Sequence, residues 1–184
     1  MPSIALHIPI SPNIKFYSKI KWIRKSLDTL GYPYNKAILH VTISNENKIS
    51  QTKLIESFEE FTKNRHRYRF YITDIDKFAQ FSYGETAGLR FKNIDDSDIT
   101  IFCDADILFI KPFDELIDQT LTYGGIYGVI AHNTPFHNLE KSNEEWWNFL
   151  FEKFTSNDKI DLKYSHSLHP QIKCPAYYNN GFII

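Results

Sequence analysis

The sequence predicts an α/β fold with a mostly parallel sheet and helices on both of its faces. Short apolar segments typical of strands alternate with longer amphipathic segments typical of helices. Segment 99–103 (ITIFC) is apolar and β-branched enough for a strand that is buried on both sides. Strands that are joined through helices form right-handed crossovers, which place the strands parallel. The length of 184 residues fits a single domain over 1–184.

The first half of the chain alternates strand and helix patterns. Segment 4–8 is apolar and ends at Pro9, which interrupts strand pairing. Apolar residues then recur every three or four positions from Tyr17 to Leu30, which indicates a helix with one apolar face, and Gly31 is a typical stop. The same reasoning predicts a strand at 37–44, a helix at 51–63, a strand at 70–73 and a helix at 83–92.

The second half continues the alternation. After the strand at 99–103, a proline in a first-turn position predicts a helix at 112–121, and a glycine-rich strand is expected at 124–131. A capping serine or asparagine predicts a helix at 143–154. The last strand, 177–184, is apolar and has no polar turn after it. We therefore expect a chain that is incomplete at its C-terminal end.

Composition narrows the function classes. Lys and Arg number 21 against 22 Asp and Glu, so the net charge is −1 and no basic footprint for nucleic acid is present. Cys103 and Cys174 are the two cysteines, too few for a disulfide framework, and we expect a reducing, cytoplasmic setting. No apolar run is long enough for a transmembrane segment, and residues 1–4 lack the pattern of a secretory signal.

Three Asp-x-Asp triplets occur, and their positions separate them. The triplet 96–98 precedes a strand and is expected in a solvated loop at its amino end. The triplets 74–76 and 104–106 follow strands, where parallel sheets bind their ligands. Asp104 and Asp106 follow the most apolar strand and precede a second apolar run, so their charges need a counterion. The hypothesis that competes with a site here is a strand-to-helix turn whose carboxylates face water.

Two carboxylates two residues apart point the same way in an extended chain. Asp104 and Asp106 can therefore converge on one hard divalent cation, Mn²⁺ or Mg²⁺. Such a cation carries the charge of a diphosphate leaving group, and the small Ala105 lets backbone approach a ligand.

Two ordered motifs resemble a known enzyme family. Segment 102–116 (FCDADILFIKPFDEL) is similar to the central segment of glycogenin-like glycosyltransferases of the GT-A fold, and 178–184 (YNNGFII) resembles their aromatic-Asn-Ser/Ala-Gly strand. The resemblance implies transfer of a sugar from a nucleotide diphosphate donor, often UDP-linked, with Mn²⁺. It assigns the metal to Asp104 and Asp106, the donor nucleotide to Ile8, Pro9, Ile10, Arg90, Asp104 and Ala105, and the donor sugar to Asn179, Asn180 and Gly181.

Other hypotheses stay open at this point. A nucleotidyltransferase would need a glycine-rich phosphate loop after the first strand, and 9–13 (PISPN) lacks one. A non-catalytic remnant that binds a nucleotide sugar is the other alternative. The sequence names no general base. Expected partners are a nucleotide-sugar donor, a saccharide or lipid-linked acceptor, and a second copy that associates through the bare C-terminal strand.

The remaining charged and histidine residues are interpreted as structural. His166 and His169 are expected in a loop, and His7 is read as a satisfied strand residue rather than a catalyst. A basic first helix usually has a solvated face, and it also fits a protein at the inner face of a membrane. The basic residues of this helix are Lys15, Lys19, Lys21, Arg24 and Lys25.

Overall fold

The computed structural model describes residues 2–45, 48–63, 65–74, 89–91, 93–130, 145, 148–149, 152, 164–165, 173–174 and 178–184. The contacts of the chain divide it into two compact units, residues 1–127 with 180–184 and residues 128–179. A single domain over 1–184 therefore stays a prediction. The second unit contains the short strands β5 (Gly128–Ile130), β6 (Tyr164–Ser165) and β7 (Lys173–Cys174), of which β6 and β7 pair antiparallel.

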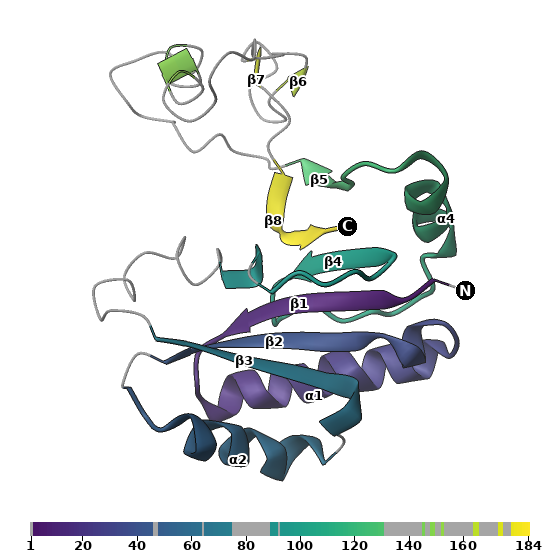
Figure 1. The fold of residues 1–184 in the computed structure, drawn as a ribbon. Helices are drawn as coiled ribbons and strands as arrows, with labels where there is room; N and C mark the ends of the chain where they lie inside the picture. The colour runs from purple at the N-terminus through teal and green to yellow at the C-terminus, as the bar shows by residue number, and fades with distance from the viewer. Residues whose placement is uncertain are drawn as a thin grey trace. The chain divides into compact units, whose positions relative to one another are not determined.

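The first unit is an α/β fold on a mostly parallel sheet (Figure 1). Its strands lie in the order β3-β2-β1-β4-β8. The chain thus moves outward from β1 to β3 and returns to place β4 on the other side of β1, which makes a topological switch point between β1 and β4. Parallel strands are β1 (Ile4–Ile10), β2 (Ile38–Asn45), β3 (Tyr68–Asp74) and β4 (Ile99–Cys103), whereas β8 (Tyr178–Ile183) runs antiparallel to β4.

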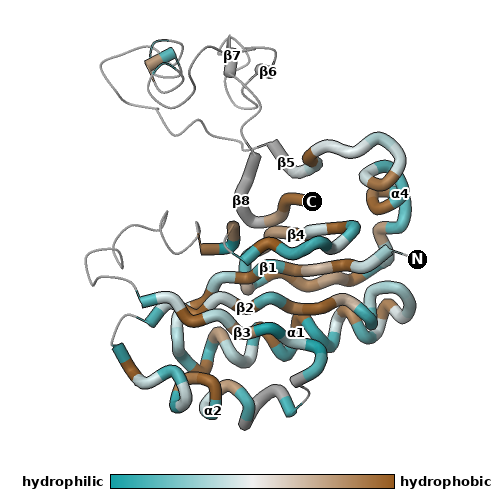
Figure 2. The backbone as a smooth tube through the Cα atoms, viewed as in Figure 1, coloured by the Kyte–Doolittle hydropathy of each residue, from teal (hydrophilic) through white to brown (hydrophobic). Residues whose placement is uncertain are grey.

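The helices α1 (Ile14–Leu30) and α2 (Gln51–Thr62) lie on the same face of the sheet (Figure 1). Hydrophobic and hydrophilic residues alternate along both, as expected of helices with one buried side (Figure 2). On the opposite face, Phe91 packs its ring on Phe102 at a centroid distance of 4.9 Å. Phe91 belongs to the 3-10 helix η4 (Leu89–Phe91), so the expectation of helices on both faces is confirmed for one face only.

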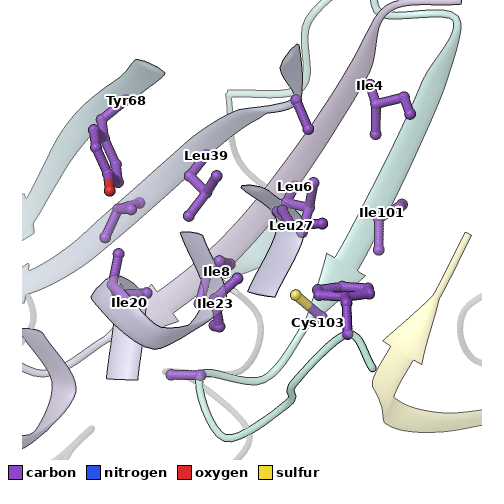
Figure 3. Packing of buried hydrophobic residues seen from close by; sticks show 14 of the residues in the cluster. Ile4, Leu6, Ile8, Ile20, Ile23, Leu27, Leu39, Tyr68, Ile101 and Cys103 are labelled. Carbon is purple, nitrogen blue, oxygen red and sulfur yellow. The ribbon is translucent and has the colours of Figure 1, made fainter. Parts of the chain in front are cut away.

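The strands present their two faces differently, because successive side chains point to opposite sides. In β1, Ile4, Leu6 and Ile8 belong to the same hydrophobic core as Ile23 and Leu27 of α1 (Figure 3). Neighbouring strands repeat this, so one face of the sheet is almost wholly apolar. The intervening residues of the central strands form a more polar face, and they include Ala5, His7, His40, Thr42, Arg69, Tyr71 and Phe102.

Helix α1 begins where the sequence offers a cap. The side chain of Asn13 accepts hydrogen bonds from the backbone N–H groups of Lys15 (3.0 Å) and Phe16 (3.2 Å). The helix ends at Gly31, whose φ of 78° favours glycine. One expectation about this helix is wrong: Arg24 does not belong to a solvated basic face, because it is 5% exposed.

A buried tyrosine fixes the start of α4 (Asp114–Tyr123). The hydroxyl of Tyr34 donates to Oδ1 of Asp114 at 2.6 Å and accepts from the backbone N–H of Phe113 at 2.8 Å. Burial, together with the hydrogen bond to Asp114, raises the pKa of Tyr34 to about 12. The hydroxyl thus links the 3-10 helix η1 (Tyr34–Lys36) to the segment that follows the acidic triplet.

We expect Tyr34→Phe to lower the free energy of unfolding at pH 7 by about 1–3 kcal/mol, since Phe113 and Asp114 lose their shared partner. A raised tyrosine pKa stabilises the folded state below the unfolded pKa near 10, and this contribution is lost between pH 10 and about 12. The difference between wild type and Tyr34→Phe should therefore shrink as the pH rises above 10. Urea unfolding at pH 7 to 11 measures it.

The control for this experiment is Tyr123→Phe, because Tyr123 is 80% exposed. It should change stability by less than about 0.5 kcal/mol at every pH. A stability difference for Tyr34→Phe that stays constant up to pH 11 would contradict the assigned role of the hydroxyl.

Most expected elements are confirmed within the described residues. The strands at 4–8, 37–44, 70–73 and 99–103 correspond to β1 to β4, and the helices from Tyr17, at 51–63 and at 112–121 correspond to α1, α2 and α4. β1 continues through Pro9 to Ile10, since the proline lacks only its own N–H donor. The strand expected at 177–184 corresponds to β8, whereas only Gly128–Ile130 (β5) of the strand expected at 124–131 is a strand, and residues 124–127 are not. The helix at 83–92 falls mostly, and the helix at 143–154 largely, outside the described residues.

The self-association expected of the C-terminal strand required this strand to be bare. In the structure it is paired instead. Ile183 and Phe182 pair with β4, and Ile184 exchanges backbone hydrogen bonds with Tyr127 at 2.8 and 2.9 Å. Ile183 and Ile184 are buried. The edge that motivated self-association is therefore partly occupied within this chain, and the association itself stays a prediction.

Candidate nucleotide and metal site

The acidic pair lies at the switch point of the sheet. Asp104 and Asp106 directly follow β4, and the register that pairs His7 with Phe102 brings the carboxyl ends of β1 and β4 to the same edge. Ligands of doubly wound sheets bind at this kind of edge. The strand ends at Cys103, however, and Ala105 and Asp106 form a turn. Strand alternation therefore does not set the directions of the two carboxylates.

Asp104 is held by a buried arginine. A guanidinium nitrogen of Arg90 lies 2.5 Å from Oδ1 of Asp104, and Arg90 is 1% exposed. A buried guanidinium needs an anion nearby, and the carboxylate of Asp104, with its side chain 46% exposed, connects it to the surface. Arg90, which the resemblance assigns to the donor nucleotide, thus lies beside the acidic triplet and belongs to the 3-10 helix η4, and its role toward a donor stays a prediction.

Asp106 pairs with a lysine rather than with Arg90. Its carboxylate lies 3.8 Å from Nζ of Lys19, a residue of α1, and its side chain is 69% exposed. This exposed pair contributes little to stability. The two carboxylates therefore sit between Arg90 and Lys19 at one edge of the sheet, with oxygen atoms accessible to a ligand.

The other residues assigned to the nucleotide are more deeply buried than Asp104 and Asp106. Ile8, Pro9 and Ile10 are buried and pair with β2, and the carbonyl oxygen of Ile10 accepts from the hydroxyl of Ser44 at 3.3 Å. The pairing of β1 with β4 ends at His7, three residues earlier than the pairing of β1 with β2. The side of β1 that faces β4 is thus where a base could approach the backbone. Ala105 is 5% exposed.

The residues assigned to the donor sugar lie in β8. Asn179, Asn180 and Gly181 belong to this strand, and their side chains fall outside the described part of the structure. Cys103, next to Asp104, is fully buried, and burial raises the pKa of its thiol to about 12. Cys103 is therefore a core residue, as expected at the end of the buried strand 99–103.

The other two triplets have structural partners. Oδ1 of Asp74 accepts from the side-chain amide of the buried Asn45 at 2.8 Å. Asp98 accepts from the backbone N–H (2.7 Å) and the hydroxyl (2.9 Å) of Ser3, which ties the amino ends of β1 and β4 together and lowers the pKa of Asp98. Asp76, His166 and His169 lie outside the described residues.

Sequence reasoning missed a second cluster, on the polar face of the sheet. His7 of β1 and His40 of β2 are partners in the strand register, and their rings stack at a centroid distance of 4.5 Å. The loop before β4 brings Asp95 to them, with Oδ2 3.1 Å from Nε2 of His40. One ligand atom from each of the three residues lies within 4.8 Å of the others. A histidine central in each of the first two strands was the only signal in the sequence.

Burial and charge set the protonation of this cluster. Burial lowers the pKa of His40, against the opposing charge of Asp95 and with help from the positive charge of Arg69. Burial raises the pKa of Asp95, but hydrogen bonds from Ser97 and the charges of the histidines outweigh it, so the net shift is downward. The pKa of His40 and the pKa of Asp95 are thus both lowered, so each of the two groups holds its proton more weakly than it does in water.

Comparison of the chain with family models, with curated proteins and with solved structures gave no match. Among the described residues, no helix has both the length and the apolar character needed to cross a membrane.

Proposed function

We propose that this chain binds a nucleotide diphosphate sugar together with Mn²⁺ or Mg²⁺ and acts as a glycosyltransferase of the GT-A fold. The observation that carries the proposal is the placement of Asp104 and Asp106 at the switch point between β1 and β4, with accessible carboxylates. The resemblance of segments 102–116 and 178–184 to glycogenin-like enzymes supports the same function. A saccharide or a lipid-linked saccharide is the proposed acceptor.

The two carboxylates are suitable ligands for a hard cation. Carboxylate oxygens are the ligands that Mn²⁺ and Mg²⁺ prefer, with waters and phosphate oxygens completing the coordination. Asp104 and Asp106 would hold the ion, which when bound neutralises the charge of the departing nucleoside diphosphate. Arg90 fixes the orientation of Asp104 through its contact with Oδ1. Lys19 adds a positive charge at the same edge, beside Asp106.

The remaining assigned residues would hold the donor. The backbone of Ile8, Pro9 and Ile10 would contact the base, and the buried Ala105 would let the main chain approach the nucleotide. Asn179, Asn180 and Gly181 would contact the sugar. The acceptor oxygen would form its bond to the anomeric carbon through an oxocarbenium-like state while the bond from that carbon to the diphosphate oxygen breaks, and the hydroxyl proton would pass to solvent.

Isothermal titration with UDP, GDP and CMP, each with and without Mn²⁺, tests the site, the base and the metal together. We expect Mn²⁺-dependent binding of one nucleotide. Asp104→Asn with Asp106→Asn should weaken it roughly 100-fold or more, because loss of even a residue that hydrogen-bonds to a metal ligand costs 10–100-fold. Asparagine keeps an acceptor oxygen for Arg90, so the variant should remain folded.

The matched control is Asp96→Asn with Asp98→Asn, the same triplet pattern at the amino end of β4. Binding should be unchanged there. Asp74→Asn should weaken binding only modestly, without altering the metal dependence. Metal-dependent binding that survives in folded Asp104→Asn/Asp106→Asn would overturn the site, and metal-dependent binding without transfer to any acceptor would identify a non-catalytic nucleotide-sugar binder.

A further inference from the structure

The polar face of the sheet holds an arrangement with the features of a transition-metal site. His7 and His40 are 1% and 2% exposed, and they project from neighbouring parallel strands at paired positions. Asp95 approaches them from the loop before β4 and has a half-exposed carboxylate, 38% exposed as a side chain. His7 pairs with Phe102, which lies two residues before Asp104, so His7 stands roughly 7 Å short of the acidic triplet along the strand direction. The cluster shares no residue with the acidic triplet.

The geometry between His40 and Asp95 suits two ligands of one ion better than a direct hydrogen bond. Nε2 of His40 lies 3.1 Å from Oδ2 of Asp95. Within the described part of the chain, this buried nitrogen nevertheless has no hydrogen-bond partner of acceptable geometry. Bonds of about 2.0–2.1 Å at tetrahedral angles place neighbouring ligand atoms roughly 3.3 Å apart, close to the observed separation.

Both residues are oriented by a second contact on their far side. Nδ1 of His40 lies 3.1 Å from the hydroxyl of Tyr71. In the tautomer with the proton on Nδ1, this nitrogen donates to Tyr71, and Nε2 directs its lone pair toward Asp95. Oδ1 of Asp95 accepts from the backbone N–H of Ser97 at 3.1 Å, which leaves Oδ2 for the cluster. Metal-binding histidines and carboxylates are typically oriented by such outer contacts.

We propose that His7, His40 and Asp95 bind a borderline divalent transition-metal cation such as Zn²⁺. Two imidazoles and one carboxylate are a ligand set that suits zinc, whereas the oxygen-only pair of Asp104 and Asp106 suits Mn²⁺ or Mg²⁺. A water molecule would complete the coordination of the bound ion. The chain thus carries two metal sites of different chemistry, one on the polar face of the sheet and one at its carboxyl edge.

Titration with Zn²⁺ alone, in the Asp104→Asn/Asp106→Asn background, tests this site without interference from the acidic triplet. We expect one equivalent to bind. Asp95→Asn should weaken it at least about 10-fold, and His40→Gln should weaken it further, since each removes a ligand. Tyr71→Phe should weaken it about 10-fold by freeing the ring of His40. Co²⁺ should give the visible absorption of a tetrahedral site in the parent and lose it in Asp95→Asn.

The matched control is Asp96→Asn, which removes a neighbouring exposed carboxylate and should leave the Zn²⁺ affinity unchanged. Asp95→Asn alters a half-exposed side chain, so it tests the proposal even if the histidine variants fail to fold. No bound Zn²⁺ in the parent protein, or equal affinity in Asp95→Asn and Asp96→Asn, would overturn the site. Because the readout needs no nucleotide, failure here leaves the proposed nucleotide site untouched, and the reverse also holds.

Discussion

Arg24→Met is expected to destabilise the protein by about 3 kcal/mol, because three charge-assisted hydrogen bonds disappear at a buried position. The guanidinium of Arg24 donates to the carbonyl oxygens of Ala37 (2.6 Å) and Tyr34 (3.1 Å) and, through Nε, to Asp28 (3.1 Å). These bonds connect α1 to the turn that enters β2. Loss of Arg24 leaves the buried carbonyl of Ala37 without its donor. Asp28 keeps a partner in Arg67.

Thermal and urea unfolding measure this effect. For a chain of 184 residues, a loss of about 3 kcal/mol corresponds to a Tm lower by roughly 6–12 °C. Lys25→Met is the matched control, since it removes the same charge from the next residue of the same helix, where the side chain is exposed. It should change stability by less than about 0.5 kcal/mol. Equal destabilisation by both variants would show that net charge, rather than the buried contacts, is responsible.

Asp104→Ala and Asp106→Ala are each expected to weaken metal-dependent nucleotide binding to a similar extent but to differ in stability. Asp104→Ala takes the carboxylate away from Arg90, which is 1% exposed, and should cost about 1–3 kcal/mol. Asp106→Ala removes only an exposed pair with Lys19 and should cost less than about 0.5 kcal/mol. Urea unfolding without metal, beside UDP titration with Mn²⁺, separates the two quantities.

Two comparisons sharpen this experiment. Asp104→Asn keeps an oxygen acceptor for Arg90, so it should recover much of the stability while still failing to bind the metal. Lys19→Met should leave stability nearly unchanged, as expected for an exposed ion pair. If Asp104→Ala and Asp106→Ala proved equally stable, the ion pair between Arg90 and Asp104 would not be the structural contact that its burial indicates.

The sequence alone predicted the α-helices and most of the strands in the described part of the first unit. Periodicity is local: apolar residues every three or four positions from Tyr17 to Leu30 are enough to predict α1, and the apolar run at 99–103 is enough to predict β4. The ranking of the acidic triplets also followed from the sequence, since the end of a strand at which a residue stands is readable from its neighbours. Asp98 does lie at the amino end of β4, where it binds Ser3.

Only the tertiary structure decided which distant residues meet. The Arg90 contact with Asp104, the burial of Arg24 and the antiparallel direction of β8 all depend on how segments far apart in the chain pack together. The same holds for His7, His40 and Asp95. Each histidine alone is typical of a satisfied strand residue. No local sequence pattern predicts that His7 of β1 lies opposite His40 of β2. Register is fixed by the burial of a whole sheet face, so a site that depends on register appears only in the folded chain.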